Sequence, residues 1–231
     1  MSLAYRQVQT FITPGQPLSG NPAAVVIGRP ENPQALAKAL SVSALAIIDP
    51  LPEGEFALSW FSAHGEIKLC GHGTLAAGHV LLEAAPDLDL VRFQTRHHGL
   101  LTVSHAPHNT AELSLPALPA QPGYQIIEMA SEAEIRAYIP QDLNPAIQTI
   151  ITAPGKDTDM VSRVFVEDRE DAATGSAHCL LGPHWAAILG KTSLTARQAS
   201  PEGGYMLLRC TGSRVHLTGR CHTLATGQLN A

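Results

Sequence analysis

Two short glycine turns, one in each half of the chain, constrain the fold more than any other feature. The first, CGHG at residues 70–73, runs into an apolar stretch at 74–83. The second, TGSA at residues 174–177, runs into a similar stretch at 178–189. Each predicts a strand–turn–helix junction, where the free N–H groups and the helix dipole favour an anion. A single glycine can simply end a strand, so it is the repetition that favours a double anion site.

Composition sets the class of protein. The chain has 231 residues, 45% of them hydrophobic, which is enough for a substantial core in one large or two small domains. The net charge of -5 is spread without a basic stripe, so we expect no nucleic-acid partner and no anionic membrane. No apolar run approaches the roughly 18 residues of a membrane span, and the start is too polar for a signal peptide. We therefore expect a cytoplasmic protein.

Cysteine and histidine spacing gives no metal or disulfide pattern. Cys70, Cys179, Cys210 and Cys221 are far apart and include no CxxC pair, which predicts free thiols. The 11 histidines contain no HExxH motif. We expect no metal.

Periodicity predicts more strands than helices. Residues 3–11, 55–61, 99–104, 111–115 and 214–218 alternate with period two, and residues 23–27, 147–151 and 163–166 are short β-rich runs. Asn32 and Pro33 predict a helix start that continues through Leu40. The helix after the second glycine turn contains Gly182-Pro183, which predicts a kink or break there. The proline-rich stretch 115–123 predicts a linker.

Each half thus holds several strands, one glycine turn and one long apolar helix. This pattern predicts an α+β fold of two duplicated lobes, each a β-sheet around its own helix, with a cleft between them. The boundaries are 1–114 for the first lobe and 115–231 for the second, with the C-terminal strand as a candidate addition to the first lobe. The weak match of CGHGT at 70–74 to TGSAH at 174–178 supports duplication.

Four stretches of the sequence resemble a known family. The string WFSAHGEIKLCGHGTLAA at residues 60–77 closely resembles the core of the PhzF-like, phenazine-biosynthesis proteins, relatives of diaminopimelate epimerase. Residues 20–26, 170–178 and 190–200 agree as well, in the same order, so the resemblance covers most of the chain. It implies two pseudo-symmetric lobes, each a rolled β-sheet around a central helix, with the active site in the cleft. It also implies a homodimer.

The chemistry implied by the resemblance is proton movement without a cofactor: isomerisation, or epimerisation in the distant relatives. Removing a proton from the carbon beside a carboxylate or enol builds negative charge. Two helix N-termini can stabilise that charge and hold a small carboxylate substrate. The matching substrate-binding positions are Asn21, Gly71, Gly73, Thr74, Thr174, Gly175, Ser176 and Ala177.

The catalytic positions carried over are His72, Asp171 and Cys70. His72 suits a proton relay because its pKa lies near working pH, or it is a polar residue capping the turn. Asp171 positions a histidine or the substrate, or caps its turn. Ser176 binds a carboxylate or is only an N-cap. Cys70 is a helix-end thiolate or a small apolar residue.

One departure concerns the family's general base. PhzF-like isomerases carry a glutamate in a Leu-Ser-Glu-Thr type motif, and here the stretch reads Leu-Ser-Val-Ser at 40–43. Val42, or Ser43 in a register shifted by one, occupies the glutamate position, and neither is a carboxylate. The approach to the second turn, 162–170, also lacks an expected insertion, which argues against assuming the phenazine-pathway substrate.

Three functions stay open. The first is a small-acid isomerase with His72, Cys70 or Asp171 as substitute base. The second is a weakly active or silent binding protein that keeps the carboxylate clamp. The third and most distant is a two-base amino-acid racemase or epimerase, which Thr174 opposite Cys70 disfavours. We predict that isomerase activity depends on His72 and Asp171 and not on residues 40–45.

Overall fold

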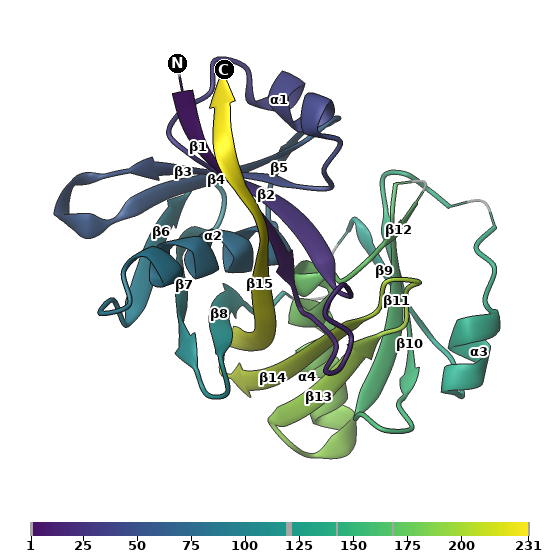
Figure 1. The fold of residues 1–231 in the computed structure, drawn as a ribbon. Coiled ribbons are helices and arrows are strands. Elements are labelled where there is room, and N and C mark those ends of the chain that lie inside the picture. Colours follow the sequence, from purple (N-terminus) through teal and green to yellow (C-terminus); the bar gives the residue numbers. More distant parts are fainter. Residues whose placement is uncertain (1, 119–121, 142, 168, 231) are drawn as a thin grey trace. The chain divides into compact units, whose positions relative to one another are not determined.

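The computed structural model describes residues 2–118, 122–141, 143–167 and 169–230. It divides into two compact units (Figure 1). Unit 1 contains the chain up to Thr10, Pro22–Leu115 and the chain from Thr218 onward; unit 2 contains Phe11–Asn21 and Pro116–Leu217. Part of the predicted linker at 115–123, residues 119–121, lies outside the described residues.

Unit 1 is a sheet rolled around one helix. Its hydrogen-bonded path closes on itself because β15 pairs with both β8 and β1. The strands in path order are β1 (Ser2–Thr10), β2 (Asn21–Ile27), β3 (Leu45–Pro50), β4 (Phe56–Ser62), β6 (Leu90–Thr95), β7 (Gly99–Ala106), β8 (Thr110–Pro116) and β15 (Arg214–Asn230). A 3-10 turn, η1 (Pro52–Gly54), and a short strand, β5 (Gly65–Ile67), flank β4.

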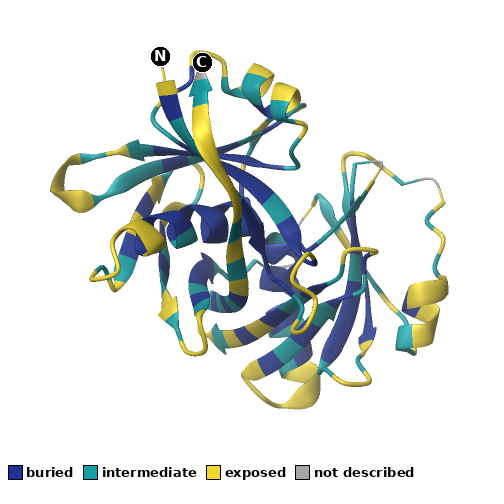
Figure 2. Ribbon diagram, in the orientation of Figure 1, coloured by how far each residue is buried: buried dark blue, intermediate teal, exposed yellow. Residues whose placement is uncertain are grey.

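Two helices pack on the unit 1 sheet. The long helix α2 (Gly71–Ala84) contacts β1, β3, β6 and β7 and is buried along most of its length (Figure 2). Because α2 is apolar on all sides, it suits an interior position. The short helix α1 (Pro33–Leu40) contacts β4 and buries its apolar side chains against a cluster that includes Leu45 and Ile47.

Unit 2 repeats this plan. Its strands in path order are β14 (Gly204–Thr211), β13 (Ser193–Gln198), β11 (Met160–Val166), β10 (Gln148–Pro154) and β9 (Tyr124–Glu128), and β12 (Arg169–Asp171) pairs with β11. The long helix α4 (Gly175–Leu189) contacts β13 and β14. The short helix α3 (Glu132–Ala137) packs on β10 and β11.

Strand pairing confirms the predicted duplication of two α+β lobes. In unit 1, β2–β3 is parallel, β3–β4 and β4–β5 are antiparallel, β4–β6 is parallel and β6–β7 is antiparallel. In unit 2, β9–β10, β10–β11, β11–β12, β11–β13 and β13–β14 follow the same sequence of directions. The short helix precedes the second strand and the long helix follows the short strand in both units.

The helix predictions were confirmed except for one. Helix α1 starts as predicted, with the Asn32 side chain accepting the Ala35 N–H at 3.0 Å. Of the kink or break predicted at Gly182-Pro183, the break is wrong, because α4 is continuous through Pro183. Proline leaves the carbonyl four residues earlier without its helical donor. Here that carbonyl, of Cys179, accepts the Leu118 N–H at 3.1 Å instead, so it has a donor although the helix contains a proline.

The strand predictions missed the length of β15. The alternating run at 214–218 is only the start of a strand that continues to Asn230. Beyond Cys221 most of its residues are exposed, so side-chain alternation carries no signal there. Backbone pairing with β1 defines the rest of the strand. The helices α2 and α4 likewise begin within the glycine turns, slightly before the predicted apolar stretches.

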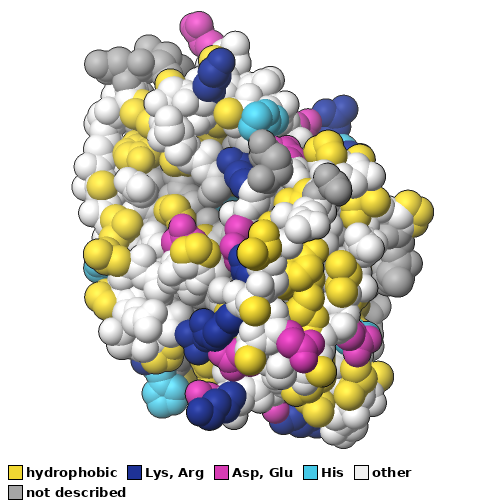
Figure 3. Space-filling view, turned by 90° about the vertical axis from the view of Figure 1, so that its right-hand side faces the viewer, with side chains coloured by type: hydrophobic (Ala, Val, Ile, Leu, Met, Phe, Trp, Pro, Cys, Tyr) yellow, Lys and Arg dark blue, Asp and Glu magenta, His cyan; other side chains and the backbone are white. Residues whose placement is uncertain are grey.

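The surface mixes charges of both signs. On the face drawn in Figure 3, Lys and Arg side chains lie among Asp and Glu side chains, with hydrophobic side chains grouped between them. Among the helices of the described residues, none has the length and apolar character that crossing a membrane requires.

Candidate active site in two parts

The first turns of α2 and α4 share one backbone design. Their N-cap residues are extended, Cys70 at φ -130° and ψ 99° and Thr174 at φ -112° and ψ 99°, and neither side chain caps its helix. In contrast, Asn32 caps α1 and Ser131 caps α3 through side-chain oxygens. The first N–H groups of a helix have no intrahelical acceptor. Helices α2 and α4 therefore keep these donors free of a side-chain cap.

A second shared feature fixes each turn from behind. The Thr74 hydroxyl donates to the Cys70 carbonyl at 2.6 Å, and the His178 ring Nδ1 donates to the Thr174 carbonyl at 2.8 Å. These are equivalent positions in the two glycine turns. Each N-cap carbonyl also accepts a backbone N–H, from Thr74 at 3.0 Å and from His178 at 3.4 Å.

Burial sets the protonation state of His178. Complete burial lowers its pKa to about 4, although the hydrogen bond to the Thr174 carbonyl acts in the opposite direction. The ring is therefore neutral at pH 7, with its proton on Nδ1 and Nε2 3.5 Å from the Ser162 hydroxyl. His178 is a structural anchor of the turn.

In unit 1, titratable groups gather at the turn. His72 is 7% exposed. Its Nδ1 lies 3.6 Å from the Cys70 sulfur, and its Nε2 lies 3.4 Å from the Ser43 hydroxyl oxygen. Ser43 uses its one proton to donate to the Pro22 carbonyl at 3.0 Å. Its oxygen can then accept a hydrogen bond from the His72 tautomer that carries a proton on Nε2, and the Cys70 sulfur lies 3.9 Å from the same Nε2.

Gly73 is required by close packing in the same turn. A Cβ at this position would lie 2.9 Å from Trp60 Cδ1 and 3.0 Å from the Cys70 sulfur. Both distances are shorter than normal carbon and sulfur contacts allow. Trp60 is itself buried, and its indole N–H has no acceptor among the described residues.

Val42 and Ser43, the two candidates for the glutamate position, have different surroundings in the structure. Val42 is partly buried and packs against the apolar cluster that includes Leu45 and Ile47. Ser43 is the residue whose side chain reaches His72. The segment at 40–45 thus contributes a hydroxyl next to His72, a contact that the sequence did not predict.

In unit 2, hydrogen bonds occupy both oxygens of the Asp171 carboxylate. Asn21 Nδ2 donates to Oδ1 at 2.9 Å, and the Thr174 hydroxyl donates to Oδ2 at 2.6 Å. Thr174 is the N-cap of α4, so Asp171 fixes the side chain at the helix start. The structure therefore brings three predicted site residues, Asn21, Asp171 and Thr174, into direct contact.

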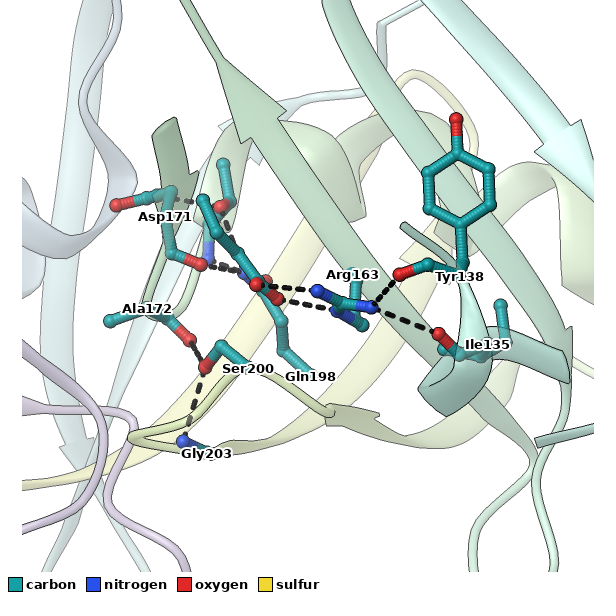
Figure 4. Close-up of polar contacts among 10 residues, drawn as sticks. Ile135, Tyr138, Arg163, Asp171, Ala172, Gln198, Ser200 and Gly203 are labelled. Atoms are coloured by element: carbon teal, nitrogen blue, oxygen red, sulfur yellow. Dashed lines mark hydrogen bonds and ion pairs between the residues drawn. The ribbon is translucent and has the colours of Figure 1, made fainter. Parts of the chain in front are cut away.

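Three successive carbonyls before α4 each accept a side-chain donor, and Figure 4 shows the first two of these contacts. Gln198 Nε2 donates to the Asp171 carbonyl at 2.6 Å, and Ser200 Oγ donates to the Ala172 carbonyl at 2.6 Å. Asn21 Nδ2 donates to the Ala173 carbonyl at 2.9 Å. Gln198 also accepts the Thr174 N–H at 2.8 Å. The backbone leading into α4 is thereby held from several sides.

An ion pair holds the strand before this turn. Arg163 on β11 donates to both carboxylate oxygens of Glu170 on β12, each at 2.7 Å (Figure 4). The same guanidinium donates to the carbonyls of Ile135 and Tyr138 at the end of α3. The hydrogen bond to Glu170 raises the pKa of Arg163, so the pair stays charged. A bidentate pair of this kind is geometrically specific.

The remaining predicted positions lie in the two first turns. Gly71 and Gly73 belong to α2, and Gly175, Ser176 and Ala177 belong to α4. The sequence named Ser43 only as a candidate for the glutamate position, and it did not assign Gln198 or Ser200 to the site. Gln198 and Ser200 fall in a stretch that resembles the family, so their positions were noticed, but polar contacts between distant strands leave no periodic signal.

Comparison with known proteins agrees with this architecture. A family model described as phenazine biosynthesis-like protein, PhzC-PhzF, matches residues 10–161. A Pseudomonas aeruginosa protein named as an uncharacterized isomerase is 34% identical, over 99% of both chains. The crystal structure of a PhzF-family phenazine biosynthesis protein from Enterococcus faecalis has a TM-score of 0.86 at 27% identity, over 100% of both chains.

A more distant structure shares the fold alone. It is a probable proline racemase from Agrobacterium radiobacter, solved with bound carbonate, with a TM-score of 0.68 at 13% identity. The alignment covers 98% of this chain and 92% of that one.

Proposed function

The chain belongs to the PhzC-PhzF family of phenazine biosynthesis-like proteins, and from this premise we propose that it is an isomerase that moves a proton on a small carboxylate-containing metabolite without a cofactor. The observation that carries the proposal is the group formed by Cys70, His72 and Ser43 at the uncapped start of α2. It combines an imidazole ring with a helix N-terminus that its N-cap side chain does not cap.

The proposed base is the Cys70–His72 pair. With its proton on Nε2, His72 presents Nδ1 to the thiol 3.6 Å away and can accept the thiol proton. A thiolate at a helix N-terminus is stabilised by the helix dipole. The pair thus supplies a base where the family's glutamate is replaced by Val42. Proton removal next to a carboxylate leaves an enolate, and the N–H groups of the first turn stabilise its charge.

In this proposal unit 2 binds the substrate and takes no part in proton transfer. Both oxygens of Asp171 already accept hydrogen bonds, so its role is to position the start of α4. The first-turn N–H groups of Gly175 and Ser176 then bind the substrate carboxylate. Thr174 donates its hydroxyl to Asp171, which leaves no second base equivalent to Cys70 and disfavours a two-base racemase.

We propose that the first turn of each helix can bind a carboxylate. Asn21 holds the turn of unit 2, and Pro22, the next residue, accepts the Ser43 hydroxyl in unit 1. A structure determined with a small carboxylate tests the idea: we expect N–H donors from residues 71–73 or from residues 175–177 on the ligand, and a carboxylate bound away from both turns would contradict it.

The experiment on function is solvent deuterium uptake into a panel of small carboxylic acids, followed by NMR. We expect uptake with the wild type and loss with His72→Ala. Val42→Glu and Ser43→Glu each restore a carboxylate in the segment, and Val42→Gln and Ser43→Gln are their uncharged controls. Because Ser43 is the side chain at His72, we expect the larger gain from Ser43→Glu.

A second candidate is a weakly active or silent binding protein of the same fold. It is favoured by the absence of a carboxylate among residues 40–45, where Val42 packs into the apolar cluster. This candidate would be supported over the isomerase if neither the wild type nor any variant catalysed deuterium uptake into any acid of the panel, while the protein bound a carboxylate saturably. A cytoplasmic location and a homodimer remain predictions, and sedimentation of the purified protein tests the latter.

A further inference from the structure

The outer face of the unit 1 sheet contains a hollow beside α1, and we propose that it is a second small-molecule site that binds an apolar carboxylate. Strand register creates the hollow. Ile47 lies opposite Ser59, Asp49 opposite Ala57, and Ala57 next to Gln94. Cross-strand partners share one face of a sheet. The small side chains of Ala57 and Ser59 therefore lie in the middle of this face among larger neighbours.

The hollow has the size and lining of a ligand site. Its volume is about 350 Å³, and its apolar walls come from Pro30, Pro33, Ile47 and Phe61. Small-molecule pockets usually have volumes of about 300–1,000 Å³ with mostly apolar walls and a few polar groups. Here Ser59 and Gln94 supply a hydroxyl and an amide.

Two charged pairs line the hollow, and their arginines are the proposed contacts for the ligand's carboxylate. Arg29 pairs with Asp49, and Arg96 pairs with Glu66 at 3.4 Å. Both arginine side chains are 77% exposed, whereas Asp49 and Glu66 are 23% and 32% exposed. The guanidinium groups thus cover the carboxylates and face the solvent. Since each guanidinium has five N–H donors, some stay available to an incoming carboxylate.

Spacing along β4 defines the ligand's length. The Asp49 pair lies beside Ala57, and the Glu66 pair lies beside Phe61. Four residues of a strand span roughly 13 Å. An acid with an apolar chain or ring can lie over Ala57 and Ser59 with its carboxylate at either arginine.

This hollow is separate from the site proposed for catalysis. Successive residues of a strand face opposite sides of the sheet. Trp60 lies against Gly73 in the first turn of α2, so Ser59 and Phe61 face the other side of β4. The inference therefore does not rest on the isomerase proposal.

Octanoate is a suitable probe, titrated into ¹⁵N-labelled protein and followed by amide chemical shifts. We expect saturable shifts in β3, β4 and the start of α1. Ser59→Phe fills the hollow, and an aromatic residue suits a strand position. We expect affinity to fall at least about ten-fold in Ser59→Phe and also in Arg96→Gln. The matched control is Arg92→Gln, which removes the same charge from β6 outside the lining and should bind as the wild type does.

His72→Ala distinguishes the two sites. Unchanged octanoate affinity in this variant supports a separate site, and its loss would assign the binding to the catalytic turn. The proposal is overturned if octanoate gives no saturable shifts up to roughly 10 mM, or if Ser59→Phe binds it as tightly as the wild type. Thermal unfolding verifies that Ser59→Phe is folded; if it is not, Arg96→Gln against Arg92→Gln decides.

Discussion

The first turns of α2 and α4 have the same backbone and opposite chemistry. Both start from an extended, non-capping N-cap, and in both a side chain four residues on donates to the N-cap carbonyl. A thiol, an imidazole and a hydroxyl lie at the first turn of α2. Around α4 stand a carboxylate with both oxygens occupied and two side-chain amides. The duplication has preserved the backbone of the turn, and under the proposed function the side chains assign proton transfer to α2 and substrate binding to α4.

Different kinds of contact hold the two turns in place. Side chains bind three successive carbonyls before α4. Before α2, tight packing of Trp60 against Gly73 fixes the turn. Polar contacts specify position in one unit, and steric contacts do so in the other.

The largest expected effect concerns the equivalent residues His72 and Ser176. If proton transfer belongs to α2 alone, His72→Ala lowers kcat/KM by about 10²- to 10⁴-fold. Ser176→Ala removes one hydrogen bond to substrate and lowers it by about ten-fold, mainly through KM. Deuterium-exchange kinetics on the best substrate of the panel measures both. Equal losses in the two variants would break the division of roles.

Ser43→Ala sharpens this test, because it leaves His72 in place and removes only the neighbouring hydroxyl. We expect a rate within about ten-fold of wild type. A loss as large as that of His72→Ala would make residue 43 part of the proton path.

The next effect is a pH dependence confined to unit 2. The pKa of His178 is about 4 in the folded protein, below the 6.5 of the unfolded chain. As pH falls from 6.5 to 4, the unfolded state binds a proton that the folded state does not, so stability falls by up to about 3 kcal/mol. His178→Thr, which copies Thr74 of unit 1, should remove this loss. Urea unfolding at several pH values measures it.

The control for that experiment is His64→Thr, at an exposed histidine between β4 and β5. It should keep the wild-type dependence on pH. If the free energy of unfolding of His178→Thr fell with pH as steeply as that of the wild type, some other group would be the cause of the acid sensitivity.

A smaller effect compares the glycines that bring each central helix close to its sheet. A Cβ at Gly78 would lie 2.4 Å from Val103 Cβ, whereas a Cβ at Gly182 would lie 3.1 Å from the Cys210 sulfur and 3.2 Å from Leu208 Cδ2. We expect Gly78→Ala to lower the free energy of unfolding by about 2 kcal/mol through overpacking. In Gly182→Ala the gain in helix propensity, up to about 1 kcal/mol, offsets the milder crowding. Equal losses in urea unfolding would contradict the difference in packing.

The smallest effect is a difference in thiol reactivity. Burial raises the pKa of Cys179, Cys210 and Cys221. Cys70 lies at a helix N-terminus beside His72, so it should react first with iodoacetamide, although it is only 5% exposed. Peptide mapping after partial labelling measures the order. Faster labelling of Cys210 or Cys221 would show that access to solvent outweighs thiolate character.

The sequence indicated the two turns because their signals are local. Glycine next to small polar residues, followed by an apolar run, marks a helix start whatever surrounds it. Asn32 and Pro33 marked α1 for the same reason. The end of β15 and the continuity of α4 through Pro183 were missed, because they depend on β1 and on Leu118, which are distant in sequence.

The sequence by itself determined the duplicated α+β lobes, the two glycine turns, the family, and the absence of a glutamate at Val42. Only the tertiary structure decided that Ser43 and not Val42 reaches His72, and that Asp171 has both oxygens occupied by Asn21 and Thr174. The reason is physical. A helix start is fixed by the preferences of adjacent residues, whereas the partner of a buried polar group is whichever donor or acceptor folding places within hydrogen-bond distance.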